Sequence, residues 1–188
     1  MILPIVAYGD PVLRKTGIEI DMEYPGLQKL IADMFETMAL AKGVGLAAHQ
    51  VGKPIRLFIV DGSSIVEDDE HPELKDFKRV FINATIIEEK GDEWKYNEGC
   101  LSIPKIREDV NRKPTIRIKY VDENFTEHEE TFTGIPARII QHEYDHIEGK
   151  LFVDRIKPLR RTLLKSRLMD IAKGNIDVSY KMKFPLKK

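Results

Sequence analysis

Two histidines four residues apart constrain this chain more than any other feature. His142 and His146 stand in the run QHEYDH, residues 141–146. If the run is helical, both imidazoles lie on one face, with about 5 to 6 Å between their Cβ atoms, which suits two ligands of one metal ion. Glu143 then falls beside the metal and can take a proton from a water molecule there. A surface helix with two solvated histidines is the plainer alternative, because short motifs give false matches.

The residues that flank the motif support a helix. Pro136 stands near the expected start and Gly149 at the expected end, the positions that helices favour for these two residues. Ile135, Ile139 and Ile140 supply apolar contacts. We therefore expect a helix with one buried face that carries both histidines.

Length and composition describe a globular protein. The chain has 188 residues, of which 42% are hydrophobic and 32% charged. This suits one well-filled core, so we expect one catalytic domain over residues 1–188, with 174–188 as a basic C-terminal tail. No apolar run approaches a membrane span, and the first residues lack the basic segment and apolar core of a secretory signal. The expected location is the cytoplasm.

Two further helices are expected. Apolar residues recur at helical spacing from Leu27 to Ala41, and Gly43 stands where a left-handed helix cap belongs. A last helix is expected from Pro158 to Lys173, ending at Gly174. Its predicted apolar stripe consists of Leu159, Leu163, Leu164, Leu168 and Ile171.

The segments between these helices predict strands. Residues 56–61 and 80–87 are rich in β-branched and aromatic side chains, and residues 115–121 alternate apolar and polar with period two. Residues 129–132 could return antiparallel to the last of these. The polar segment 62–78, which contains four consecutive acids at 67–70, is expected to form a loop outside the core.

The fold class that follows is α+β. Antiparallel or mixed sheets are expected to pack around the central helix of the histidine motif, with an N-terminal helix before them and a C-terminal helix after them. Residues 175–188 alternate weakly, at Val178, Tyr180, Met182 and Phe184, and are a candidate edge strand.

A run of small residues follows the first helix. Residues 43–52 read GVGLAAHQVG, and such residues let the backbone approach a ligand closely. The run lacks the Lys-Ser/Thr ending of a phosphate loop. Taken alone, it favours a helix cap followed by a tightly packed strand. Gln50 is its one functional side chain.

Cys100 is the single cysteine, so an intramolecular disulfide is excluded. A lone cysteine is usually an inert part of the core. Beside His142 and His146, however, a thiolate completes a set of three metal ligands. Such a set leaves a fourth position for water, which is the arrangement of a catalytic rather than a structural site.

Three segments together resemble the peptide deformylase family, whose members remove the N-formyl group from newly made bacterial and organellar polypeptides. They are GVGLAAHQ at 43–50, EGCLS at 98–102 and the histidine motif, in the family's order. The resemblance covers residues 1 to about 172. His49 departs from it, since many relatives have Thr or Ser there. The segment 62–78 is longer than usual, and the tail after Gly174 is unmatched.

The resemblance implies a metal-dependent hydrolase that releases formate from the formyl-methionine of nascent chains. Its metal ligands would be Cys100, His142 and His146, with Fe²⁺ as the native ion and Zn²⁺, Ni²⁺ or Co²⁺ as substitutes. Glu143 would move the proton. The Gln50 side-chain amide and the Leu101 backbone NH would meet the negative charge that develops on the carbonyl oxygen.

Formyl is the smallest acyl group, so a tight wall of Gly45 and Leu46 can admit it and exclude an internal peptide bond. By resemblance, four residues lie near the pocket for the methionine side chain: Val44, Ile135, Arg138 and Ile139. Glu98 and Arg107 are expected to orient the site rather than react. Gly99, next to the cysteine, completes the set expected to bind substrate.

Two other functions are weighed against this one. A zinc endopeptidase also uses the HExxH motif, but the sequence lacks a downstream third ligand in the usual protease arrangement and has a cysteine upstream instead. A metal-stabilised binding module would need a closed fourth coordination position, which no second cysteine or well-placed histidine offers.

The basic pole of the chain suggests a partner. Residues 155–188 hold eleven Lys or Arg against two Asp, although the net charge of the chain is only −1. Family members meet nascent chains at the ribosome, so the last helix could contact ribosomal RNA, whereas charge runs most often form a solvated face. The residues concerned are Arg160, Arg161, Lys165, Arg167 and Lys173. Neither a membrane nor specific DNA is an expected partner.

Overall fold

The computed structural model describes residues 1–65 and 71–187 and has the α+β fold expected from the sequence. Its helices are α1 (Leu27–Leu40), α2 (Gly134–Ile147) and α3 (Pro158–Lys173). Several single-turn 3-10 segments join them to the strands. No helix within the described residues is both long and apolar enough to cross a membrane.

The main sheet has five antiparallel strands in the order β2-β3-β4-β7-β8. Their bounds are Gly45–Ala47, Leu57–Asp61, Lys78–Lys90, Thr115–Val121 and Glu127–Thr133. The strands expected over 56–61, 80–87, 115–121 and 129–132 are confirmed. β4 is longer than expected because its second half runs on as a half-exposed ribbon against β7.

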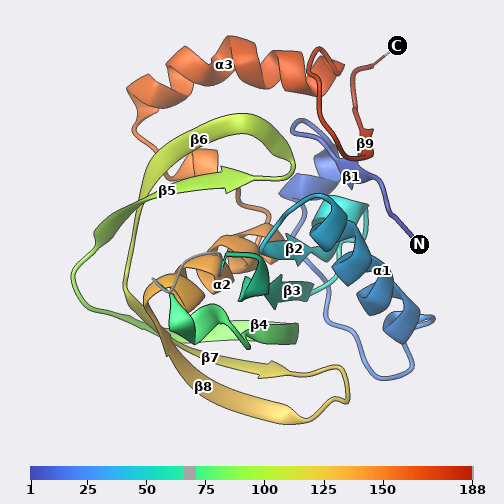
Figure 1. Cartoon of the computed structure of the whole chain (residues 1–188), viewed down its shortest axis with the longest axis vertical. Helices are drawn as coiled ribbons and strands as arrows, with labels where there is room; N and C mark the ends of the chain where they lie inside the picture. The colour runs from blue at the N-terminus through green and yellow to red at the C-terminus, as the bar shows by residue number, and fades with distance from the viewer. Residues whose placement is uncertain (66–70, 188) are drawn as a thin grey trace.

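The helix of the histidine motif is confirmed, and it occupies the centre of the molecule. Figure 1 shows α2 between the main sheet and a second hairpin. Its apolar side chains Ile135, Ile140 and Ile147 join a core cluster with Phe58 and Phe81 from the sheet. Burying each such side chain stabilises the fold by roughly 1.5 to 3 kcal/mol, so the position of α2 is firmly fixed.

The second hairpin consists of β5 (Trp94–Cys100) and β6 (Ile103–Arg112). The sequence predicted only the turn around the cysteine, and the structure reduces this turn to Leu101 and Ser102. Pairing of β5 with β6 places Cys100 at the end of a strand, directly over α2.

The first helix is confirmed, but the glycine cap expected after it is wrong. Lys42, not Gly43, takes the left-handed conformation, with φ at 55°. Gly43 is required for another reason: a Cβ there would lie 2.7 Å from Cδ1 of Leu101, closer than real Cβ contacts come. This close approach brings the end of α1 against the β5–β6 turn.

The segment 62–78 is only partly the loop outside the core that its polar composition predicts. Leu74 is fully buried and Phe77 nearly so, and both belong to the same core cluster as Phe58. The expectation of a loop outside the core is therefore wrong for these residues. The acidic run 67–70 lies outside the described residues.

The last helix has the predicted bounds, and Gly174 caps it with φ at 76°. Its predicted stripe is wrong at two positions. Leu164 and Leu168 are buried, whereas Leu159 and Leu163 are 72% and 63% exposed. α3 lies along the outer side of the β5–β6 hairpin (Figure 1), and only its face with Leu164, Leu168 and Ile171 joins the core cluster that contains hairpin residues.

The candidate edge strand in the tail is confirmed in a short form. β9 (Met182–Lys183) pairs in parallel with β1 (Ile5–Val6), and the two lie side by side in Figure 1. The amides of Ile5 and Ala7 donate to the carbonyls of Lys181 and Lys183, both at 2.9 Å. The N-terminal and C-terminal segments of the chain are thereby joined.

Candidate active site

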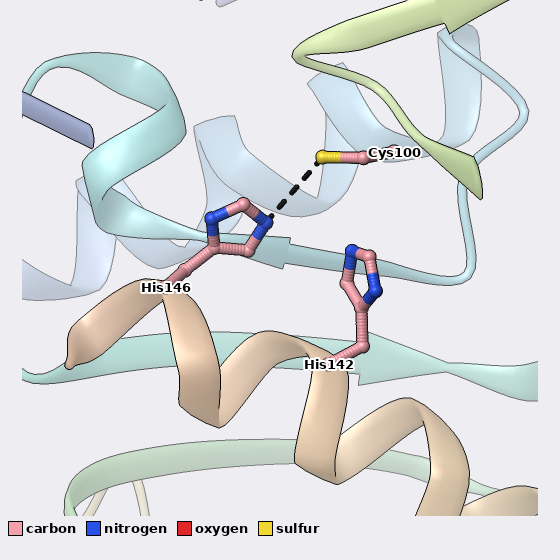
Figure 2. A group of neighbouring side chains, drawn as sticks. All are labelled: Cys100, His142 and His146. Carbon is pink, nitrogen blue, oxygen red and sulfur yellow. Dashed lines mark hydrogen bonds between the residues drawn. The ribbon is translucent and has the colours of Figure 1, made fainter. Parts of the chain in front are cut away.

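The three expected metal ligands converge. The thiol of Cys100 comes from the end of β5, and the imidazoles of His142 and His146 come from successive turns of α2 (Figure 2). One ligand atom from each lies within 4.8 Å of the others, and Sγ of Cys100 is 3.4 Å from Nε2 of His146. This arrangement is consistent with a divalent metal site, as the spacing of the two histidines predicted.

A carboxylate fixes the orientation of the first histidine. Nδ1 of His142 donates to Oε2 of Glu98 at 3.0 Å, which leaves Nε2 as the nitrogen available to a metal. His146 is 1% exposed, and burial lowers its pKa. It is thereby kept in the neutral form that a ligand requires.

Glu98 is itself held by two arginines. Arg112 donates to both of its oxygens at 2.7 and 3.0 Å, and Arg138 adds a bond at 2.9 Å. Burial opposes ionisation of Glu98, yet hydrogen bonds from His142 and Arg112 outweigh it and hold the pKa of Glu98 well below its usual value. The carboxylate is therefore charged at any working pH.

The buried charges continue behind the site. Nη1 of Arg112 lies 2.8 Å from Asp145, and Arg155 binds the same carboxylate at 2.6 Å. Arg112 has no counterpart among the residues singled out from the sequence. An arginine in a polar stretch resembles a surface residue, and only the fold shows that it is 3% exposed.

Glu143, the proposed base, is buried beside the three expected metal ligands. Glu143 is 4% exposed, and its Oε2 has no hydrogen-bond partner within the described residues. Burial raises its pKa to about 7. A carboxyl group with such a pKa can both accept and return a proton near neutral pH.

The glycine run lies against this carboxyl group. A Cβ at Gly45 would lie 2.7 Å from Cδ of Glu143, so no larger residue fits without displacing it. The strand β2 thus passes so close to Glu143 that glycine is required at position 45. The sequence indicated close backbone approach, and the structure identifies Glu143 as the group approached.

Gln50 points toward the same place from the short helical turn Ala48–Val51. Its Oε1 accepts from the Ala47 amide at 2.9 Å, which turns Nε2 toward the β5–β6 hairpin. Nε2 lies 3.3 Å from Oγ of Ser102 and 3.5 Å from Sγ of Cys100. An amide donor is therefore aimed at the metal ligands.

A cavity of about 820 Å³ opens beside this group. Most of the residues expected from the sequence line it: Val44, Gly45, Gln50, Glu98, Gly99, Cys100, Leu101, Arg107, Ile135, Arg138, Ile139, His142 and Glu143. Leu46 and His146 are the exceptions. The side chain of Leu46 is fully buried in the core against α1, and His146 is 1% exposed.

Other lining residues were missed by sequence reasoning. Tyr96, Pro104 and Ile106 come from the unpredicted hairpin, and Asp177 to Tyr180 come from the tail. The hairpin was missed because the buried apolar residues of β6, Ile103, Ile106 and Val110, do not follow the period of two that marks a strand. No local signal marks the tail as part of the cavity.

Comparison with known proteins decides the family. The sequence model described as polypeptide deformylase matches residues 2–162 of the chain. The chain belongs to this family. A peptide deformylase from Christiangramia forsetii is 56% identical over 98% of this chain and 97% of its own length.

Solved structures of deformylases agree. The enzyme from Legionella pneumophila is 36% identical, covers 93% of this chain and 98% of its own, and superposes with a TM-score of 0.79. The one from Plasmodium falciparum is 33% identical, with coverages of 90% and 95% and a TM-score of 0.80. The chain is a peptide deformylase, which removes the N-formyl group from nascent polypeptides.

Proposed function

We propose that Cys100, His142 and His146 hold one divalent metal ion, and that this site hydrolyses the formyl amide of N-terminal formyl-methionine. The observation that carries the proposal is the convergence of three donor atoms within 4.8 Å at the edge of a cavity that also receives Glu143. When bound, such an ion lowers the pKa of water and polarises the formyl oxygen.

The donors fit this group. One thiolate and two imidazoles suit Zn²⁺, Fe²⁺, Co²⁺ or Ni²⁺. The hydrogen bond from His142 to Glu98 leaves a lone pair on Nε2, as a ligand needs. We take Fe²⁺ as the native ion, with the other three as substitutes, as the resemblance to the family implies.

The residues around the ligands have distinct roles in the proposal. Glu143 takes a proton from the water whose oxygen attacks the formyl carbon. As the carbon–nitrogen bond breaks, Glu143 passes this proton to the leaving amine, and formate is released. The side-chain amide of Gln50 and the backbone NH of Leu101 donate to the former carbonyl oxygen while it carries negative charge.

The cavity supplies selectivity. Val44, Ile135 and Ile139 offer apolar surface to the methionine side chain, and Arg138 closes the pocket with its guanidinium over the ring of Trp94, 4.5 Å from the centroid. The strand at Gly45 passes close to Glu143, and this tight wall favours the small formyl group over larger acyl groups.

Two residues next to Gly99, Glu98 in the sequence and Arg107 in space, hold the shape of this site. Nη1 of Arg107 would lie 2.7 Å from a Cβ at Gly99, so the arginine packs directly on the backbone next to the cysteine. Arg107 also donates to Asn97 at 2.8 and 2.7 Å. These contacts support the orienting role that we assign to Arg107, with Glu98 orienting His142.

The test is substrate choice. Purified protein should release formate from formyl-methionyl peptides, leave acetyl-methionyl peptides of the same sequence intact, and not cut casein. Cleavage of casein or of internal bonds at a comparable rate would favour the endopeptidase alternative.

We also propose that α3 contacts ribosomal RNA. The support is its exposed position on the outside of the molecule and its run of basic residues. Arg160 pairs with Glu108 at 2.5 Å and Arg161 with Asp154 at 3.3 Å, so part of this charge is used within the chain. Within the described residues, Lys165 and Lys173 have no ion pair and are the better candidates.

Sedimentation with ribosomes tests this contact. Binding should weaken steeply as salt rises, because contacts with phosphates release counterions. The double variant K165E/K173E should sediment less while retaining formate release, since neither lysine lines the cavity. Sedimentation that is unaffected by both salt and charge reversal would contradict the proposal.

A further inference from the structure

The tail after α3 returns to the active site. Asp177 to Tyr180 line the cavity together with Lys42 from the end of α1 and Lys105 from β6. The family model ends at residue 162, so these residues lie beyond the part of the chain that it matches.

The tail is firmly placed. Gly174 ends α3 in the left-handed conformation, and the amide of Leu186 donates back to the carbonyl of Ala172 at 3.0 Å. Between these points, Met182 and Lys183 form the strand that pairs with β1. Tyr180 is thereby held two residues before this strand.

Tyr180 contacts the turn that carries the reacting groups. Its hydroxyl donates to the carbonyl of Leu101 at 2.7 Å. Leu101 follows the metal ligand Cys100, and its own NH is the proposed donor to the developing oxyanion. Tyr180 therefore binds the residue whose backbone orientation matters most for that donor.

A second hydrogen bond holds the β5–β6 turn, and its donor follows β1, the strand that pairs with β9. The amide of Tyr8, just after β1, donates to the carbonyl of Ser102 at 2.8 Å. Two successive carbonyls of the β5–β6 turn are thus held by residues that flank β1 and β9. The turn needs such partners, because the pairing of β5 with β6 is irregular between Gly99 and Cys100.

We propose that Tyr180 is a positioning residue for deformylation: by holding the Leu101 carbonyl it fixes the turn 100–102, and with it the NH of Leu101. This inference rests on the proposed role of Leu101. Tyr180 lines the cavity, and its hydroxyl is used in the bond to the Leu101 carbonyl.

The test compares two conservative variants. Tyr180→Phe removes the hydroxyl and keeps the ring in the wall of the cavity. Tyr120→Phe is the matched control, since its hydroxyl donates to Glu130 on the β7–β8 hairpin and the residue does not line the cavity. Each variant loses one hydrogen bond, and the bond of Tyr120 is to a carboxylate, so Tyr120→Phe should lose at least as much thermal stability as Tyr180→Phe.

Only Tyr180→Phe should lose turnover. We expect kcat for a formyl-methionyl tripeptide to fall about 3- to 10-fold with little change in KM, as befits a hydrogen bond of ordinary strength that acts on a transition-state donor. Metal content should equal that of the unmodified protein. A kcat that matches the Tyr120→Phe control would overturn the role of Tyr180, and so would a fall in kcat that is explained entirely by lost metal.

The two proposals fail separately. If the unmodified, metal-loaded protein releases no formate, the proposed site is wrong. If it is active and Tyr180→Phe behaves like the control, only the positioning role is wrong.

Discussion

The carboxylate of Glu98 and the imidazole of His142 form a 3.0 Å hydrogen bond between residues 44 positions apart in the sequence. The bond joins the unpredicted hairpin to the helix of the histidine motif. It fixes one nitrogen of the ring as donor and leaves the other for a metal, and outer partners of this kind set the affinity of a metal site.

Glu98→Gln should therefore weaken metal binding by about 10- to 100-fold. It should also destabilise the fold, by about 3 to 5 kcal/mol at most, because Arg112 and Arg138 lose their charged partner in a buried site. Competition with a chelator and urea unfolding measure the two effects. Glu108→Gln, at the cross-strand position, is the control and should change neither by much. Unchanged metal affinity in a folded Glu98→Gln would refute the orienting role.

Glu143→Gln should keep the metal and the fold but lower kcat by about 10²- to 10⁴-fold, because an amide of the same shape cannot accept a proton. Formate release and metal analysis on the same samples measure this. Glu148→Gln, at the end of the same helix and paired with Arg56, should remain active. Near-normal turnover by metal-loaded Glu143→Gln would rule out Glu143 as the base.

Gly45→Ala should lower turnover by about 10²-fold, since a methyl group at this position must push the Glu143 carboxyl group from its place and small displacements of reacting groups are that costly. The measurement is kcat at full metal occupancy. Gly52→Asn is the control, because a Cβ at Gly52 meets no atom within 4 Å and Asn tolerates its φ of 81°. Equal losses in both variants would point to a general effect on folding.

His49 should make the protein sensitive to acid. Burial lowers its pKa to about 4 from 6.5; Nε2 lies 3.0 Å from the carbonyl of Lys15, while Nδ1 has no partner in the described residues. The unfolded chain therefore binds a proton at higher pH than the folded chain. Stability is full above pH 6.5 and falls as the pH drops toward 4, by up to about 3 kcal/mol from this residue alone.

Urea unfolding at pH 7.5 and at pH 5 measures this loss. In His49→Thr the loss between the two pH values should be smaller than in the unmodified protein, even if the variant is less stable at pH 7.5. Equal losses would assign the acid sensitivity to other groups.

Exchange of the metal should show that the candidate ions support different rates of formate release. Protein prepared in air should lose activity as iron oxidises and dissociates, and anaerobic Fe²⁺ or aerobic Ni²⁺ should restore more activity than Zn²⁺ does. Formate release is compared at equal occupancy, with Cys100→Ala as a variant that should bind no ion tightly. A zinc form as active as the iron and nickel forms would contradict Fe²⁺ as the native ion.

The elements that the sequence predicted keep one regular pattern of buried and exposed residues, or end at a residue with a distinct conformation. β7 alternates between the core and the solvent, and α3 ends at a glycine whose conformation other residues avoid. The parts that it missed bury charge. β5 and β6 place Glu98 and Arg112 where a pattern of alternation expects apolar side chains, so this hairpin resembles a loop in the sequence.

The candidate site shows the same division. Cys100, His142 and His146 could be found because metal coordination demands particular residue types at particular spacings. Tyr180 could not be found, because nothing in its neighbourhood distinguishes it from any tyrosine in an edge strand. Its contact with Leu101 depends on how two distant segments pair.

The pairing of β1 with β9 also has a consequence for the order of folding. It joins Ile5 to Met182, and closing so long a loop costs entropy before any contact repays it. The amides of Ile5 and Ala7 should therefore gain protection from hydrogen exchange during refolding later than the amides of the β3–β4 pair. Since this pairing holds Tyr8 and Tyr180 against the β5–β6 turn, catalytic competence should appear with this late phase, after most of the secondary structure has formed.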